Sequence, residues 1–372
     1  MIFQYVVFAF IGAIFLHIIS TLYHKKIVFT DRVATQTLYY ITCILFIIFI
    51  IVFCAFREIG IKIGGTDANG YRLQFLDSTG SFIEQLKRFA GWEPLHFTSL
   101  WFVRKITDNY TIFLIILYFV VSLLLIKYAK LFELNINYFL SSYLLLLLVI
   151  NSFNIQRNIF AVFLGFFVID AIIQGKYKKA TIITFLIVGF HFSAALYFLI
   201  ILSFLLIKYI KGNPKYKLVG YLIISSVLSI GISICAPFIL GSSRLSVYKA
   251  GGNISYSMLM SFIIIVLFHR LYLKDIQDNM RINALTILYI SFMPMFVFQL
   301  FYSIMYRMML YSLPVLFILL AEYKKLLIKS RDRYAVVFFL IFEVLLVARI
   351  ISFFVSDIVD LGNYYNYFFE YL

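Results

Sequence analysis

Residues 111–126 have the sequence TIFLIILYFVVSLLLI, and Lys127 and Lys130 follow directly. A helix of about 20 apolar residues spans the hydrocarbon core of a bilayer, and basic residues at one end of such a run mark its cytoplasmic side. The same combination recurs along the chain. It predicts a helical membrane protein, because a β-barrel would instead show segments of about ten alternating residues.

Composition agrees with this prediction. The 372 residues are 63% hydrophobic and carry a net charge of +15, whereas soluble domains are about 45–50% apolar. Because the basic residues lie in short connections between apolar runs, they are placed to meet anionic lipid headgroups. We therefore expect membrane lipids as partners and no nucleic acid. The three cysteines show neither metal-ligand nor disulfide spacing.

We expect an all-α polytopic membrane protein in which residues 1–372 form a single membrane-embedded domain. The twelve expected spans lie near 2–22, 38–56, 111–126, 137–152, 157–174, 180–191, 192–208, 218–240, 256–272, 282–301, 307–321 and 334–355. Alternate connections hold 20 of the 32 Lys and Arg residues, so the positive-inside rule places those connections in the cytoplasm and both termini outside. The first span lacks a basic start and a small-residue cleavage site, which predicts that it is retained.

The connection 57–110 is much longer than the others and faces outward in this topology. Loops of this length are usually functional or carry their own structure. A glycine-rich turn surrounds Asp67, and amphipathic stretches run from Ser81 to Phe89 and from Glu93–Pro94 through Lys105. We expect short helices here that lie on the membrane surface.

Arg157 follows the polar break 151–156 and opens an apolar helix. Backbone N–H groups and a guanidinium then point together at an anion, for which a diphosphate is the obvious candidate. The alternative is an arginine that snorkels to lipid headgroups.

Other polar residues from different connections share the outward side. The candidates for binding a diphosphate or glycan are Arg57, Arg72, Arg157, Arg244, Tyr248 and Arg307, and the candidate general bases are Asp67, Glu93 and His191. Converging arginines suit a diphosphate because each guanidinium binds phosphate oxygens in a fork and stays charged. A carboxylate or imidazole can take a proton from a hydroxyl, although a lone histidine at an interface is more often structural. No metal-ligand or phosphate-loop motif is present, so we expect neither metal nor cofactor.

An ordered set of short motifs resembles the EpsG/Wzy-like family of bacterial polysaccharide polymerases. The motifs are Arg57 with GGTDANGY (64–71), Glu93–Pro94, QRNIFA (156–161), HFSAAL (191–196) and Tyr306–Arg307. The resemblance implies a bacterial inner-membrane enzyme that joins undecaprenyl-pyrophosphate-linked oligosaccharide repeats on the outer face, making O-antigen, capsular or exopolysaccharide chains. It also implies similarity to GT-C glycosyltransferases, in which Asp67 would take the place of the acidic base.

This resemblance predicts an inverting, metal-independent transfer, with the arginines stabilising the departing diphosphate. A chain-length regulator and a flippase of the same pathway are further expected partners. The rival functions are a lipid-linked oligosaccharide flippase or other transporter and an O-antigen ligase-like transferase. Transporters usually show internal symmetry and polar residues near the midplane, which this sequence does not show clearly.

Overall fold

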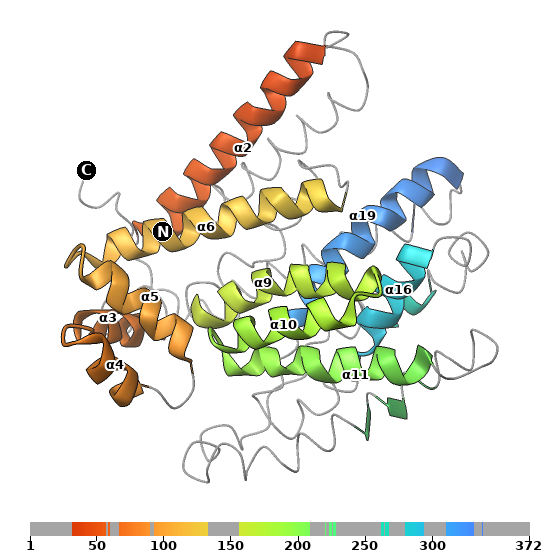
Figure 1. Cartoon of the computed structure of the whole chain (residues 1–372). Coiled ribbons are helices and arrows are strands. Elements are labelled where there is room, and N and C mark those ends of the chain that lie inside the picture. Colours follow the sequence, from red (N-terminus) through yellow and green to blue (C-terminus); the bar gives the residue numbers. More distant parts are fainter. Residues whose placement is uncertain are drawn as a thin grey trace, which may run out of the picture. The chain divides into compact units, whose positions relative to one another are not determined.

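A computed structural model describes most of the central part of the chain. The described residues are 32–56, 59, 67–89, 93–132, 156–208, 220, 223–224, 226–227, 262–263, 265–267, 280–293, 310–330 and 337. Within these ranges all regular structure is helical, with no strand (Figure 1). The expected spans 2–22, 137–152, 218–240, 256–272 and 334–355 lie wholly or mostly outside the described residues, so the count of twelve stays a prediction.

The chain divides into two compact units, residues 1–163 with 344–372 and residues 164–343. The described helices of the first unit are α2 (Arg32–Ala55), α3 (Ala68–Leu76), α4 (Phe82–Phe89), α5 (Pro94–Arg104), α6 (Tyr110–Leu131) and the start of α9 (Gln156–Ile173). Two helices among the described residues, α6 and α9, are long and apolar enough to cross a membrane. They match the expected spans 111–126 and 157–174.

Helix α2 packs against α6 and has two unlike faces. One face buries apolar and sulfur-containing side chains, namely Cys43, Phe46, Ile50 and Cys54, and the other exposes Ile41, Ile44, Leu45, Ile48 and Val52. A helix that is apolar on its exposed face as well as its buried face is typical of a membrane environment. Helix α2 begins at Arg32, six residues before the expected span 38–56.

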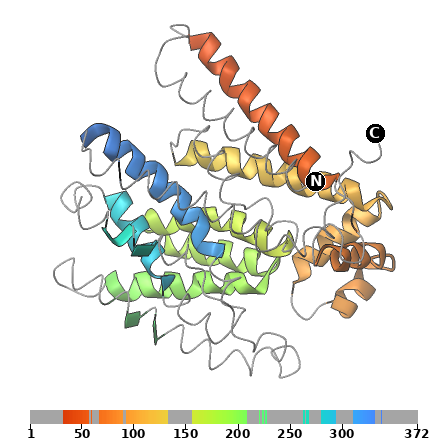
Figure 2. The same ribbon diagram turned by 180° about the vertical axis from the view of Figure 1, so that it is seen from behind.

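The long connection before α6 contains three short helices, which Figures 1 and 2 show as one cluster near the start of α6. We call α3, α4 and α5 the outer-loop helices. Two of them were expected from the sequence, whereas α3 was not. Helix α4 begins with a capping box, since the Ser81 N–H donates to the Glu84 carboxylate over 2.7 Å and the Glu84 N–H donates to Oγ of Ser81 over 3.3 Å. The bond from the Ser81 backbone lowers the pKa of the Glu84 carboxyl.

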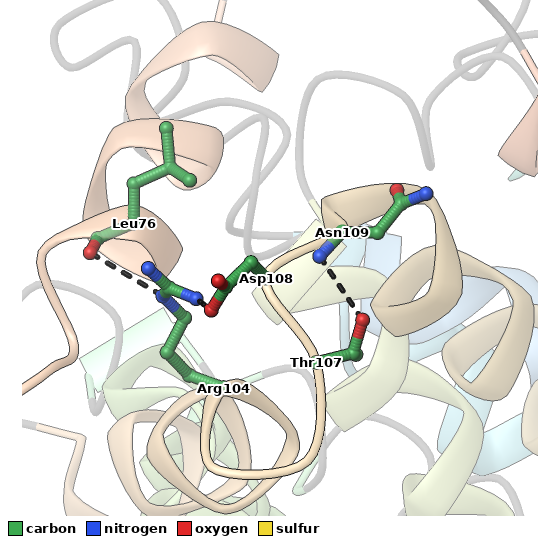
Figure 3. Close-up of polar contacts among 5 residues, drawn as sticks. All are labelled: Leu76, Arg104, Thr107, Asp108 and Asn109. Carbon is green, nitrogen blue, oxygen red and sulfur yellow. Dashed lines mark hydrogen bonds and ion pairs between the residues drawn. The ribbon is translucent and has the colours of Figure 1, made fainter.

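Arg104 fixes the end of α5 against its neighbours (Figure 3). Its Nε donates to the backbone oxygen of Leu76 over 3.5 Å, and its guanidinium pairs with Asp108 and lies 5.8 Å from the ring centroid of Phe75. One residue later, the Asn109 side chain caps α6 by accepting from the Thr111 N–H over 2.9 Å. Arg104 therefore links α5 to α3 and to the turn that precedes α6.

The second unit begins within α9, which ends in a Schellman motif. The N–H of Lys176 donates to the oxygen of Ala171 over 2.8 Å, and the N–H of Gly175 donates to that of Ile172 over 2.9 Å. Gly175 has φ +70°, a conformation that strains other residues. The helix therefore stops where a basic connection begins, as the sequence predicted.

Two helix pairs account for most of the rest of the described second unit. Helices α10 (Tyr177–Val188) and α11 (Leu196–Lys208) form a hairpin through the 3₁₀ turn η1 (Phe192–Ala195). This confirms the break expected between the spans 180–191 and 192–208. Helix α11 packs closely on α9, because a Cβ at Gly165 would lie only 2.6 Å from Cζ of Tyr197.

Helices α16 (Met280–Ile290) and α19 (Leu313–Ser330) pack together. Arg281 lies 3.5 Å from the Glu322 carboxylate, and the Thr286 and Tyr323 hydroxyls are 3.1 Å apart. The start of α16 thus meets the later part of α19. Helix α19 runs to Ser330, nine residues past the expected end at 321, because its Lys, Leu and Ile residues continue the helix beyond the apolar core.

Candidate functional site

Arg157 and Glu93 form an ion pair at the start of α9. Nη1 of Arg157 donates to Oε2 of Glu93, a residue 64 positions earlier in the chain. Helix α5 positions the carboxylate, since Glu93 is its N-cap residue and Pro94 fixes the first turn. The Glu93 side chain is 6% exposed, whereas that of Arg157 is 24% exposed. The guanidinium is therefore the accessible member of the pair.

Tyr71 covers the Arg157 guanidinium. Its ring centroid lies 5.1 Å from Cζ of Arg157, within the range of a cation–π contact. His96 in turn packs edge-on against the Tyr71 ring, with 6.2 Å between the two ring centroids. Both aromatic residues are buried. Helix α3 supplies Tyr71 through its first turn, where the Tyr71 N–H donates to the oxygen of Asp67 over 3.2 Å.

A second contact joins the starts of α6 and α9. The Tyr110 hydroxyl donates to Oε1 of Gln156 over 2.7 Å, and both residues are buried. The first residues of two apolar helices therefore lie at the same end of the unit. This is the arrangement that the alternation of basic connections requires, since both helices should begin on the outer side.

The resulting cluster consists of Tyr71, Glu93, His96, Tyr110, Gln156 and Arg157. Its chemistry favours binding an anion, because an arginine offers five N–H donors, more than its contacts with Glu93 and Tyr71 use. Within the described part of the chain, Nε of Arg157 and Nε2 of Gln156 have no hydrogen-bond partner. The helix N-terminus adds positive potential at the same place.

Two other candidate residues, Asp67 and Arg72, are close to Tyr71 in the sequence but make different contacts. Asp67 is the N-cap residue of α3 and is half-buried. Arg72 donates from Nη1 to the backbone oxygen of Ile59 over 2.6 Å. That bond gives Arg72 a role in holding α3 to the chain that follows α2.

His191 belongs to the second unit, where it precedes η1 in extended conformation. Two residues later, the Ser193 hydroxyl lies 3.0 Å from that of Tyr311, which belongs to the 3₁₀ turn η3 (Leu310–Ser312) directly before α19. The role of His191 as a base stays a prediction. Four further candidates, Arg57, Arg244, Tyr248 and Arg307, lie outside the described residues.

Sequence reasoning identified Glu93 and Arg157 separately but did not pair them, and it gave no role to Tyr71, Tyr110 or Gln156. The available signals were weak. Tyr71 follows Asp67 by four residues, the spacing of neighbours on one helix face, and Gln156 precedes Arg157 at a polar break. Among the described residues, no group of three or more His, Cys, Asp or Glu side chains could hold a metal ion.

Comparison with known proteins gives one result. A model of the EpsG family matches residues 39–371, nearly the whole chain, and this is a polysaccharide polymerase-like family. No curated protein and no solved structure matches the chain. The matched range includes every residue of the Glu93–Arg157 cluster. Together with the apolar helices, the match indicates a membrane protein of polysaccharide biosynthesis.

Proposed function

Since this chain belongs to the EpsG family, we propose that it is a polymerase that joins undecaprenyl-pyrophosphate-linked oligosaccharide repeats. It would make O-antigen, capsular or exopolysaccharide chains on the outer face of a bacterial cytoplasmic membrane. The enzyme would be an inverting glycosyltransferase of GT-C-like architecture with both termini outside. Its reaction would need no metal or other cofactor.

The observation that carries this proposal is the accessible Arg157 guanidinium at the first turn of an apolar helix. Glu93 and Tyr71 hold it in one orientation, while its Nε has no partner among the described residues. A guanidinium and a helix N-terminus at the membrane boundary suit the diphosphate of a lipid carrier. The glycan would then lie in water and the lipid in the bilayer.

In the proposed reaction, an acceptor hydroxyl oxygen attacks the anomeric carbon of the growing chain. The new C–O bond forms as the bond from that carbon to the diphosphate oxygen breaks, and the diphosphate leaves with the electron pair. The hydroxyl proton passes to a base of the enzyme. Direct displacement inverts the anomeric centre, and Arg157, with the candidates Arg57, Arg72, Arg244, Tyr248 and Arg307, would bind the diphosphate or glycan.

The base would be Asp67, Glu93 or His191. Pairing with Arg157 favours an orienting role for Glu93, because a carboxylate that is stabilised by a guanidinium is a weaker base. Asp67 begins the helix whose Tyr71 covers Arg157, and the Tyr71 N–H donates to its backbone oxygen. We therefore assign the proton transfer to Asp67 first.

A deletion strain complemented with this gene tests the proposal. Lipid-linked glycans are extracted from the outer face and sized. A polymerase deletion should retain single repeats outside and lose chains, with chains restored by the wild-type gene. Loss of all outer repeats would instead identify a flippase, and long chains that stay on the lipid carrier would identify a ligase.

A further inference from the structure

We propose that Gln156 and Arg157 together form one phosphate-binding cradle, in which the Gln156 carboxamide supplies donors to the same anion as the guanidinium. This inference rests on the proposed function and extends it to a residue with no assigned role. The ligand chemistry is a phosphate oxygen at the start of α9. The source is the diphosphate of the lipid carrier, and the alternative source is a phospholipid headgroup.

The orientation of the Gln156 carboxamide is the first support. Its Oε1 accepts the hydroxyl hydrogen of Tyr110 over 2.7 Å. With its oxygen engaged in this bond, the carboxamide has the two N–H groups of Nε2 left as donors. The side chain is held by a tyrosine that is itself buried and stacked on Phe113 at 5.7 Å between ring centroids.

The second support is that these donors are buried without an acceptor. Gln156 is 1% exposed, and Nε2 has no hydrogen-bond partner among the residues that the structure describes. Buried polar groups are paired in more than about 90% of cases, because an unpaired donor lowers stability. An acceptor oxygen supplied by a ligand would pair these donors.

The third support comes from the next residue. Arg157 is held on one side by Glu93 and on the other by Tyr71, and its Nε is likewise buried and unpaired in the described chain. Two consecutive residues at one helix start therefore each have a buried donor without an acceptor among the described residues. Phosphate oxygens, with several lone pairs each, can accept from both residues at once.

Binding of radiolabelled undecaprenyl diphosphate to the full-length protein in detergent micelles tests the cradle. Gln156→Glu keeps the acceptor for Tyr110 but removes both N–H donors, and Gln156→Leu removes them without adding charge. Hydrogen bonds to charged groups correspond to about 10- to 100-fold in affinity. Both variants should therefore bind the diphosphate about 10- to 100-fold more weakly, with unchanged affinity for phosphatidylglycerol.

Gln85→Leu is the matched control, because Gln85 is a buried glutamine of α4 outside the cluster. It should bind undecaprenyl diphosphate like the wild type. Tyr110→Phe leaves Gln156 in place but frees its amide to rotate, so it should weaken binding by a smaller factor. This variant keeps the inference testable if both Gln156 variants fail to fold.

The outcomes separate the inference from the function on which it rests. If the wild type binds the diphosphate selectively and all three site variants match it, the cradle is wrong while the polymerase proposal stands. If phosphatidylglycerol displaces the diphosphate at equal concentration, the site is a headgroup site. That result would overturn the lipid diphosphate as the ligand and, with it, the proposed role of Arg157.

Discussion

Glu93, at the start of α5, and Arg157, at the start of the apolar helix α9, lie 64 positions apart in the chain and meet as an ion pair. The pair has one nearly buried member and one accessible member. Such an arrangement orients the arginine without using all of its donors. The carboxylate of Glu93 thus links the outer-loop helices to the first turn of α9.

Replacing Arg157 by lysine should lower the rate of polymer formation about 100-fold. A lysine keeps the charge but cannot bond Glu93, lie flat against Tyr71 and bind phosphate with a fork at the same time. Chain length on extracted lipid-linked glycans is the measurement. Arg104→Lys is the control, since Arg104 has comparable contacts outside the cluster. Normal polymer from Arg157→Lys at normal expression would favour simple headgroup snorkelling.

Asp67→Asn and Glu93→Gln should both slow chain growth but differ in their effect on stability. Loss of a general base lowers the rate about 10²–10⁴-fold. Glu93→Gln also leaves the Arg157 charge partly buried without its carboxylate, which costs about 1–3 kcal/mol. Thermal unfolding in detergent should therefore shift for Glu93→Gln and not for Asp67→Asn. Wild-type chain growth by Asp67→Asn would exclude it as the base and make His191 the next residue to replace.

Alanine at two glycines should have opposite effects on stability. At Gly165 a Cβ would overlap the Tyr197 side chain, so Gly165→Ala should destabilise the protein by about 1–3 kcal/mol. At Gly70, within α3, a Cβ would meet nothing within 4 Å, so Gly70→Ala should stabilise the helix by about 0.5–1 kcal/mol. Denaturant titration of both variants in one detergent compares them. Equal shifts would contradict the close approach of α9 and α11.

Labelling with an impermeant thiol reagent should test the direction in which the chain crosses the membrane. In a variant that lacks Cys43, Cys54 and Cys235, cysteine at Thr79 should react in intact cells and cysteine at Lys178 only after lysis. Both positions are exposed in the structure. Ser78, although adjacent, is 1% exposed and would be silent in either orientation. Reaction of Lys178→Cys in intact cells would reverse the topology.

The capping box of α4 should be sensitive to acid. The folded protein lowers the pKa of Glu84 through the N–H of Ser81, so this contribution is present above the ordinary glutamate pKa of about 4.3. It is lost as the pH falls through the lowered value. Hydrogen exchange of the α4 amides should therefore gain protection with rising pH beyond the intrinsic rate change, and Glu84→Gln should remove that gain. Identical profiles for wild type and Glu84→Gln would mean that the carboxylate does not cap the helix.

The local sequence predicted those helices whose apolar runs are bounded by polar breaks or basic clusters. Helices α6 and α9 begin within one residue of expectation, because a polar break or basic cluster marks their ends. The break between α10 and α11 was predicted as the boundary between the spans 180–191 and 192–208. Helix α3 was missed because its sequence ANGYRLQFL contains glycine and lies in a glycine-rich loop. Its buried contacts through Tyr71 and Phe75 outweigh that weak propensity.

For the site, the sequence predicted individual residues but not their contacts. The helix start and the charge of Arg157 are visible in the sequence, and so is the acidic residue before Pro94. Their pairing depends on how α5 folds back beside α9, which no local pattern encodes. The Tyr110–Gln156 bond, between residues 46 positions apart, depends on tertiary structure in the same way.

The buried cysteines of α2 allow local opening of the protein to be measured as a rate of thiol modification. Cys43 and Cys54 are 7% and 0% exposed and lie about three turns apart on the buried face of α2, opposite its exposed face. An alkylating reagent can reach Cys54 only while the residues that bury it have moved away. In the native chain the rate at which Cys54 becomes modified therefore measures how often the packing around α2 opens, without any introduced label.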